Sequence, residues 1–187
     1  MPAAPHARFT LLALPALAIA LSAALPAAAG EPKPWEPKEM VVGTLALADF
    51  ATVLPLWQER GDKYVPYPDV IELLKGSAPA EIEVIFGSWC SDSFEQVPYL
   101  VTALKAAGNP SLALTLVGVD RKKDEPEGRG KAADVKRVPT IVVRRAGEEI
   151  GRVIETPSTA TLDRDVAMIL NGIPLPPKPG AEDGAKK

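Results

Sequence analysis

The sequence predicts an α/β fold, a three-layer α/β/α arrangement in which helices cover a central mixed sheet. Three observations indicate this class. Residues 81–86 form an apolar run, a helical pattern follows at 91–107, and a second apolar run comes at 112–119. Two further apolar segments joined by a tight turn follow, and a last helical pattern comes after them. Strands that alternate with helices and end in a hairpin are typical of the α/β class.

The first 29 residues are typical of a secretory signal. A weakly basic start precedes an apolar core at 11–25, and small residues at 27–29 offer a cleavage site. A retained membrane anchor is the alternative, but the apolar run is short and contains Pro15. We therefore expect an exported protein, periplasmic in a Gram-negative cell and secreted otherwise.

Prolines mark the elements that follow. Residues 30–40 combine prolines with charges and predict an extended linker. A helix is expected across 49–59, kinked near Pro55, and a short helix across 70–75. These segments form an N-terminal helical extension of the domain.

Hydrophobic spacing defines the rest of the domain. The 91–107 pattern places apolar residues on one helical face: Phe94, Val97, Leu100, Val101 and Leu104. The later segments predict a strand at 112–119, a helical turn at 131–135, a hairpin of strands at 140–144 and 149–155, and a helix at 162–170. The domain should therefore span 41–172. Residues 173–187 are rich in proline, glycine and charge, and are expected to be disordered.

Composition excludes several classes of site. The chain holds one cysteine and one histidine, and its formal net charge is −3. The histidine, His6, lies within the predicted signal, so the exported protein would have no imidazole. A metal or haem site of the usual His/Cys type and a Ser-His-Asp triad are therefore not expected. Mild acidity argues against nucleic acid as a partner. No cofactor or metal is expected, and the protein should be a monomer.

The single cysteine, Cys90, lies between the 81–86 run and the 91–107 helical pattern. At such a junction, backbone N–H groups and the helix dipole stabilise a thiolate. A buried and inert cysteine is the alternative. We favour a reactive thiol because strand-to-helix junctions expose the residue there.

Two neighbours of Cys90 bear on its chemistry. Ser93 lies one helical turn further on and could donate a hydrogen bond to the sulfur, cap the helix, or do both. It cannot resolve a mixed disulfide, because that step needs a second thiolate. Asp92 stabilises the helix start, but its negative charge disfavours a thiolate beside it.

The run Trp89-Cys90-Ser91-Asp92-Ser93 and the later Val138-Pro139 resemble the thioredoxin superfamily over about residues 66–170. In this resemblance Ser93 replaces the second cysteine. It implies a thioredoxin-like fold and a cis bond before Pro139. It also makes Trp89, Val138 and Pro139 candidate substrate-binding residues, with the Val138 backbone pairing with a bound peptide.

The resemblance has one departure. Dithiol members often carry a buried acid six residues before the first cysteine, and Val84 occupies that position here. The adjacent Glu83 should point to the opposite face of the strand.

The residues therefore favour an exported monothiol protein that exchanges disulfides through Cys90, with Ser93 as second catalytic residue. Its partners would be protein or small-molecule thiols and disulfides. A redox-inactive thioredoxin-like binding module is the alternative. A thiol peroxidase is weaker, because residues 87–89 lack the expected threonine. The charged loop 121–125 is interpreted as a solvated turn, with a basic rim for an acidic partner as its alternative.

Overall fold

The computed structural model describes Met1 and residues 33–179, and these 33–179 residues belong to one packed unit. Apart from Met1, the predicted signal segment lies outside the described residues. Residues 180–187 of the predicted tail lie outside them as well. None of the described helices is long and apolar enough to cross a membrane.

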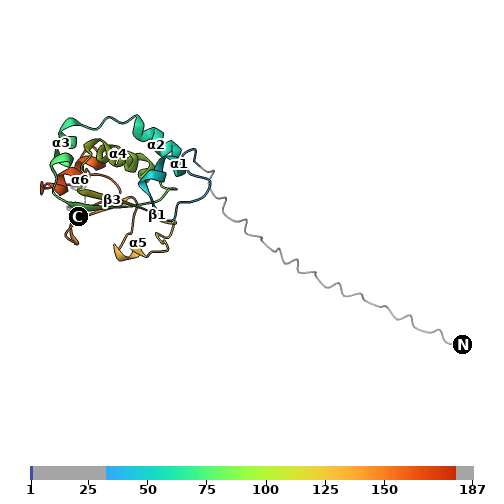
Figure 1. Ribbon diagram of the computed structural model, residues 1–187. Helices are drawn as coiled ribbons and strands as arrows, with labels where there is room; N and C mark the ends of the chain where they lie inside the picture. The colour runs from blue at the N-terminus through green and yellow to red at the C-terminus, as the bar shows by residue number, and fades with distance from the viewer. Residues whose placement is uncertain (2–32, 180–187) are drawn as a thin grey trace. The chain divides into compact units, whose positions relative to one another are not determined.

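One mixed sheet of five strands forms the centre of the fold (Figure 1). Its strand order is β1-β3-β2-β4-β5, and β2 runs parallel to β3 while the other neighbours are antiparallel. The strands are β1 (Gly43–Leu45), β2 (Ala80–Phe86), β3 (Leu112–Gly118), β4 (Thr140–Arg145) and β5 (Glu148–Ile154). The strands expected at 81–86, 112–119 and 140–144 are neighbours in this sheet, and the hairpin partner β5 lies at one edge.

The edge strand β1 was not predicted. Its three residues are too few for a periodic signal, and they precede an Ala/Leu-rich segment. It pairs with β3 where Gly118 allows close approach: a Cβ at Gly118 would lie 2.3 Å from the Val41 carbonyl oxygen. Only glycine fits this contact without moving the chain.

The helices largely follow the predicted ranges. They are the 3-10 turn η1 (Leu47–Asp49), α1 (Phe50–Val53), α2 (Pro55–Asp62), α3 (Pro68–Gly76), α4 (Ser91–Ala107), α5 (Arg129–Ala132) and α6 (Leu162–Leu170). The segment expected as one kinked helix divides at Leu54, because Pro55 fits the first turn of a new helix. The helical turn expected at 131–135 lies two residues earlier, at α5.

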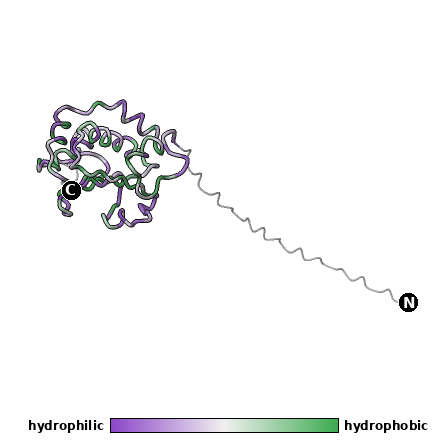
Figure 2. The backbone as a smooth tube through the Cα atoms, viewed as in Figure 1, coloured by the Kyte–Doolittle hydropathy of each residue, from purple (hydrophilic) through white to green (hydrophobic). Residues whose placement is uncertain are grey.

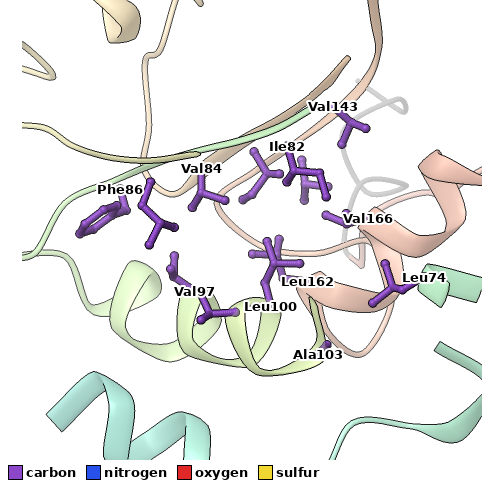
Figure 3. Packing of buried hydrophobic residues seen from close by; sticks show 14 of the residues in the cluster. Leu74, Ile82, Val84, Phe86, Val97, Leu100, Ala103, Val143, Leu162 and Val166 are labelled. Atoms are coloured by element: carbon purple, nitrogen blue, oxygen red, sulfur yellow. The ribbon is translucent and has the colours of Figure 1, made fainter. Parts of the chain in front are cut away.

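Helices cover the two faces of the sheet unequally. On one face α4 and α6 lie against the strands, and α3 packs on both of them while α2 packs on α4 (Figure 1). This face holds the larger apolar core, where Ile82, Val84 and Phe86 of β2 meet Val97 and Leu100 of α4 (Figure 3). Among residues 33–179, the opposite face carries α5, its flanking loops and a smaller apolar cluster. Hydrophobic residues accordingly concentrate along the strands, and hydrophilic ones on outer turns and loops (Figure 2).

Candidate thiol site

A short turn positions Cys90. Strand β2 ends at Phe86, and the Cys90 N–H closes the turn by donating to the Gly87 carbonyl at 2.9 Å. Cys90 is the N-cap residue of α4, and its own carbonyl accepts the Phe94 N–H at 3.0 Å. Its side chain is half-buried. The first-turn N–H groups of α4 have no partner within the helix and lie at this end, beside the thiol.

The structure brings the Cys90 side chain against the backbone of Val138, the residue before Pro139. The Cys90 thiol donates a hydrogen bond to the Val138 carbonyl, with 3.2 Å between Sγ and oxygen. Val138 and Pro139 are buried, and the peptide bond that joins them is cis. Cys90 and Trp89 pack against the smaller apolar cluster, which contains Val138. The thiol therefore sits between backbone and apolar side chains, with part of its surface open.

Trp89 forms a fixed wall next to the thiol. Its Nε1–H donates to the Val119 carbonyl at 3.0 Å. Its ring lies over Gly87, where an added Cβ would come within 2.7 Å of the ring. On the ring, the Arg121 guanidinium and the Lys123 ammonium lie 5.0 Å and 5.9 Å from the centroid. Two basic residues of the charged loop 121–125 therefore lie against Trp89, next to the thiol. A basic rim around the site would need this placement.

Ser93 is fully buried beneath the turn. Its Oγ accepts the Gly87 N–H at 3.2 Å. In the part of the chain that the structure describes, Ser93 makes no hydrogen bond with Cys90. The contact that the sequence suggested between the hydroxyl and the sulfur is therefore not made, and Ser93 instead holds the turn that carries the thiol.

Residues 33–41 contact the site from outside, which sequence reasoning missed. The Trp35 ring stacks on Phe94 of α4 with centroids 4.8 Å apart. Glu36 pairs with Arg121 at 2.9 Å, the same arginine that lies over Trp89. The Val41 N–H donates to Ser88 Oγ at 3.0 Å. The packed part of the chain therefore begins before residue 41, and a tryptophan in a proline-rich segment was the available signal.

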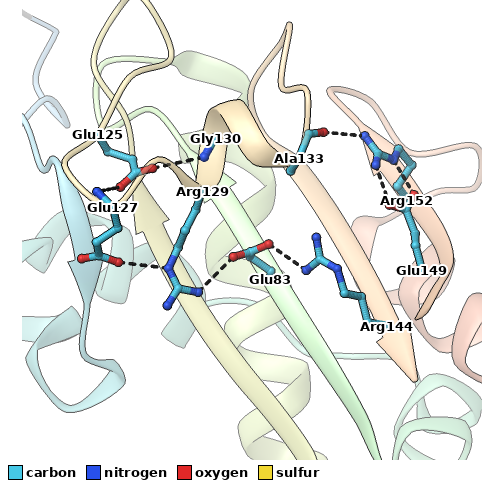
Figure 4. Close-up of polar contacts among 9 residues, drawn as sticks. All are labelled: Glu83, Glu125, Glu127, Arg129, Gly130, Ala133, Arg144, Glu149 and Arg152. Atoms are coloured by element: carbon cyan, nitrogen blue, oxygen red, sulfur yellow. Dashed lines mark hydrogen bonds and ion pairs between the residues drawn. The ribbon is translucent and has the colours of Figure 1, made fainter. Parts of the chain in front are cut away.

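An ion-pair network fastens the loop around α5 to the sheet (Figure 4). Glu83, buried on β2, pairs with Arg129 of α5 at 3.1 Å and with Arg144 of β4 at 2.8 Å. The Glu125 carboxylate accepts the Gly130 N–H at 3.2 Å. Glu83 does point to the face opposite Val84, as predicted, and its carboxylate is committed to two arginines. These contacts hold the loop that contributes Val138 to the site.

Comparison with known proteins finds weak structural likenesses and no sequence match. No protein-family model and no curated protein matches the sequence. A Pseudomonas aeruginosa protein of unknown function is 20% identical, covers 68% of this chain and 76% of its own, and has a TM-score of 0.41. A yeast mitochondrial 1-Cys peroxiredoxin is 23% identical over 49% of this chain and 79% of its own, with a TM-score of 0.35. Mitochondrial thioredoxin 3 from Saccharomyces cerevisiae is 21% identical over 46% and 74%, with a TM-score of 0.32.

The fold class is α/β, and the order of elements is the one expected of a thioredoxin-like fold: α3, β2, α4, β3, the β4-β5 hairpin and α6. At these identities and scores the likenesses assign no activity.

Proposed function

We propose that this protein is an exported, thioredoxin-like thiol–disulfide exchange protein that acts through Cys90 alone, in mixed-disulfide reduction or isomerisation. The observation that carries the proposal is the position of the thiol. Cys90 is a half-buried N-cap residue whose sulfur lies 3.2 Å from the Val138 carbonyl oxygen, at the mouth of an apolar cluster. Free helical N–H groups at this end can stabilise the sulfur anion that attacks.

The exchange takes two steps. The Cys90 thiolate bonds to one sulfur of a disulfide, the disulfide bond breaks, and the other sulfur leaves as a thiolate that takes a proton from water. A second, external thiolate then attacks the mixed disulfide and releases Cys90. The external thiol is required because the chain has one cysteine. Before it reacts, the Cys90 thiol must lose its proton, and its hydrogen bond to the Val138 carbonyl must break.

The other candidate residues hold and present the sulfur. Trp89 and the buried Val138 lie beside Cys90 in the smaller apolar cluster, and the buried Pro139 follows Val138 in the chain. A bound chain would lie along them and bring its disulfide to the exposed side of the thiol. Ser93 acts by positioning, through its bond to the Gly87 N–H.

Reaction with an uncharged disulfide tests the proposal. Native protein treated with 2-hydroxyethyl disulfide should gain one mercaptoethanol adduct by intact-mass measurement, and added 2-mercaptoethanol should remove it. The rate should exceed that of a small unperturbed thiol by on the order of tenfold. Cys90→Ser should form no adduct and keep the fold.

A second candidate function is a binding module without turnover. One observation favours it: the thiol donates to a backbone carbonyl and has no hydrogen bond from Ser93 among the described residues. If Cys90 reacts no faster than a free thiol, the exchange proposal is wrong and the binding module takes its place.

A further inference from the structure

A small hollow lies where Trp35 packs on α2 and α4. Trp35 stacks on Phe94 of α4, and its carbonyl accepts the Nε1–H of Trp57 of α2 at 3.2 Å. The hollow has a volume of about 240 Å³. Four apolar and three charged side chains line it: Pro34, Trp35, Leu56, Phe94, Glu59, Arg60 and Lys63. None of the candidate thiol-site residues is among them, so the hollow is a separate feature of the molecule.

Gly61 brings α2 close to α4 beside this hollow. A Cβ at Gly61 would lie 2.7 Å from Thr102 Oγ1 of α4, so a larger residue would crowd the two helices. The close approach places the preceding residue, Arg60, against the aromatic rings of α4. Its guanidinium carbon lies 5.1 Å from the ring centroid of Phe94 and 5.0 Å from that of Tyr99. Both contacts restrict the arginine to one position.

The Arg60 guanidinium supplies the net charge of the hollow. Its Nε–H donates to the Glu95 carbonyl at 3.4 Å. Among residues 33–179, Arg60 lies in no ion pair, and its two terminal nitrogens donate no hydrogen bond. The other two charges neutralise each other, because Lys63 pairs with Glu59 at 2.6 Å. One positioned cation therefore remains without a counter-charge.

This state distinguishes Arg60 from the other arginines of the described chain. Within residues 33–179, Arg145 is the other arginine outside an ion pair, and it donates to the Leu170 carbonyl at 2.7 Å. A guanidinium presents parallel N–H groups that match the two oxygens of a carboxylate. The terminal N–H groups of Arg60 are thus placed to bind such a group.

The walls next to Arg60 are apolar. The Trp35 and Phe94 rings lie 4.8 Å apart between centroids, and Leu56 is 42% exposed although it lies against them in the hollow. Covering this surface would remove apolar area from water, which favours a ligand with an apolar group. The ligand should therefore combine a carboxylate with an apolar body.

We propose that this hollow binds a small monocarboxylate whose apolar body is about the size of a phenyl ring. The carboxylate accepts hydrogen bonds from the terminal N–H groups of Arg60, and the ring lies against Trp35, Leu56 and Phe94. The volume is below that of sites for drug-sized ligands, which limits the ligand to a compound of this size. The inference goes beyond disulfide exchange and does not depend on Cys90.

Four compounds test the two halves of the ligand. 3-Phenylpropionate has the ring and the negative charge, propionate lacks the ring, 3-phenylpropanamide lacks the charge, and 3-phenylpropylamine reverses it. Titration of ¹⁵N-labelled protein is followed through the indole N–H signals of the three tryptophans, which Trp→Phe variants assign. 3-Phenylpropionate should shift the Trp35 signal to saturation and leave the Trp89 signal in place. Its affinity should exceed that of each other compound by about tenfold or more.

Variants locate the binding. Arg60→Gln should weaken binding of 3-phenylpropionate by on the order of tenfold. Arg60→Lys keeps the charge without the paired N–H groups and should have an intermediate affinity. Lys75→Gln on α3 changes the net charge as Arg60→Gln does and should bind as tightly as the native protein. Leu56→Gln removes an exposed apolar wall and should weaken binding several-fold, so the test stands even if the Arg60 variants do not fold.

The outcomes that would overturn the inference are specific. They are a Trp35 signal that does not shift, equal affinities for the acid and the amide, and a folded Arg60→Gln variant that binds as tightly as the native protein. Cys90→Ser should bind 3-phenylpropionate with unchanged affinity. Failure of this inference is therefore distinguishable from failure of the proposed exchange reaction.

Discussion

At the scale of single residues, the site depends on which groups contact the backbone of one turn. Cys90 and Ser93 are one helical turn apart, yet their side chains bond to different partners. The Cys90 thiol donates to Val138, while Ser93 accepts the Gly87 N–H from inside the core. Ser93 is therefore buried one helical turn after the thiol, where a second sulfur would be protected from solvent.

Ser93→Cys should convert the site to a dithiol. Residues i and i+3 at a helix start have the geometry that Cys-x-x-Cys motifs use, so a disulfide with Cys90 should form on oxidation. Free-thiol counts before and after oxidation measure this change. Ser93→Ala is the control: it removes the bond to Gly87 and should cost about 1 kcal/mol of stability without a new thiol. Two reactive thiols that persist after oxidation would contradict the expected geometry.

Another residue-scale prediction concerns Asp163, which is buried in the first turn of α6. The Tyr64 hydroxyl donates to Asp163 Oδ2 at 2.9 Å, while Asp163 Oδ1 and the buried Thr161 hydroxyl have no partner among the described residues. Burial raises the pKa of Asp163. Burial, together with the Asp163 carboxylate, raises the pKa of Tyr64 well above its usual range. An ionised Asp163 carboxylate therefore destabilises the folded state.

Asp163→Asn should stabilise the protein at neutral pH. It keeps an acceptor for Tyr64, removes the buried charge, and supplies a donor near Thr161. The pKa of Asp163 is higher in the folded state than in the unfolded state. At a pH between the two values, the folded state therefore binds a proton that the unfolded state does not. Native stability falls as pH rises through that window. The gain of the variant should thus be largest above the folded pKa and vanish below pH about 4, near the unfolded value.

Urea unfolding of both proteins across this pH range measures the effect. Tyr64→Phe is the opposite test: it removes the hydrogen bond from Tyr64 to the carboxylate and should destabilise the protein by about 2 kcal/mol at neutral pH. If the difference in unfolding free energy between Asp163→Asn and the native protein is the same at every pH, the pKa of Asp163 is the same in the folded and unfolded states and the prediction is wrong.

At the scale of elements, two segments without long regular structure hold the site in place. The segment 33–41 contacts α4 through Trp35, the 121–125 loop through Glu36, and the turn before Cys90 through Val41. The loop around α5 is fixed to the sheet through Glu83. Side-chain contacts far apart in the sequence therefore decide where the thiol turn lies.

Trp35→Ala should destabilise the domain by about 2 kcal/mol, because it removes a stacked aromatic pair and half-buried apolar area on α4. Urea unfolding followed by circular dichroism measures the change. Trp35→Phe keeps a ring over Phe94 and should retain most of the stability. An unchanged midpoint for Trp35→Ala would return residues 33–40 to the role of an extended linker.

At the scale of the whole molecule, the described residues cover one face of the sheet with several helices and the other face with the short helix α5. The larger core lies under α4 and α6, and supports the strands that carry the site. The other face holds the thiol cluster and the Glu83 network. This division separates the stabilising core from the face at which we propose chemistry.

The predicted export belongs to this scale. The mature protein should begin at or near Gly30, since small residues at 27–29 follow the apolar core. Intact-mass measurement of the protein recovered outside the cytoplasm checks the new N-terminus. Recovery of a chain that retains residues 1–29 in the membrane fraction would show an anchored protein instead.

The sequence by itself determined the α/β class, the central strands, the bounds of α4 and α6, and Cys90 as the reactive candidate. Apolar periodicity and glycine or proline breakers are local signals, so each segment could be interpreted alone. The place of Val138 and Pro139 beside Cys90 was also predictable, but through resemblance rather than spacing.

Only the tertiary structure decided which side chains contact one another. A serine three residues after the cysteine has several possible hydrogen-bond partners within reach. The packing of the turn decides that Ser93 Oγ accepts the Gly87 N–H and makes no hydrogen bond with the Cys90 sulfur. The strand β1 and the docking of Trp35 on Phe94 join residues far apart in the chain. Such contacts leave no periodic trace, because their free energy arises only when the folded chain brings the two surfaces together.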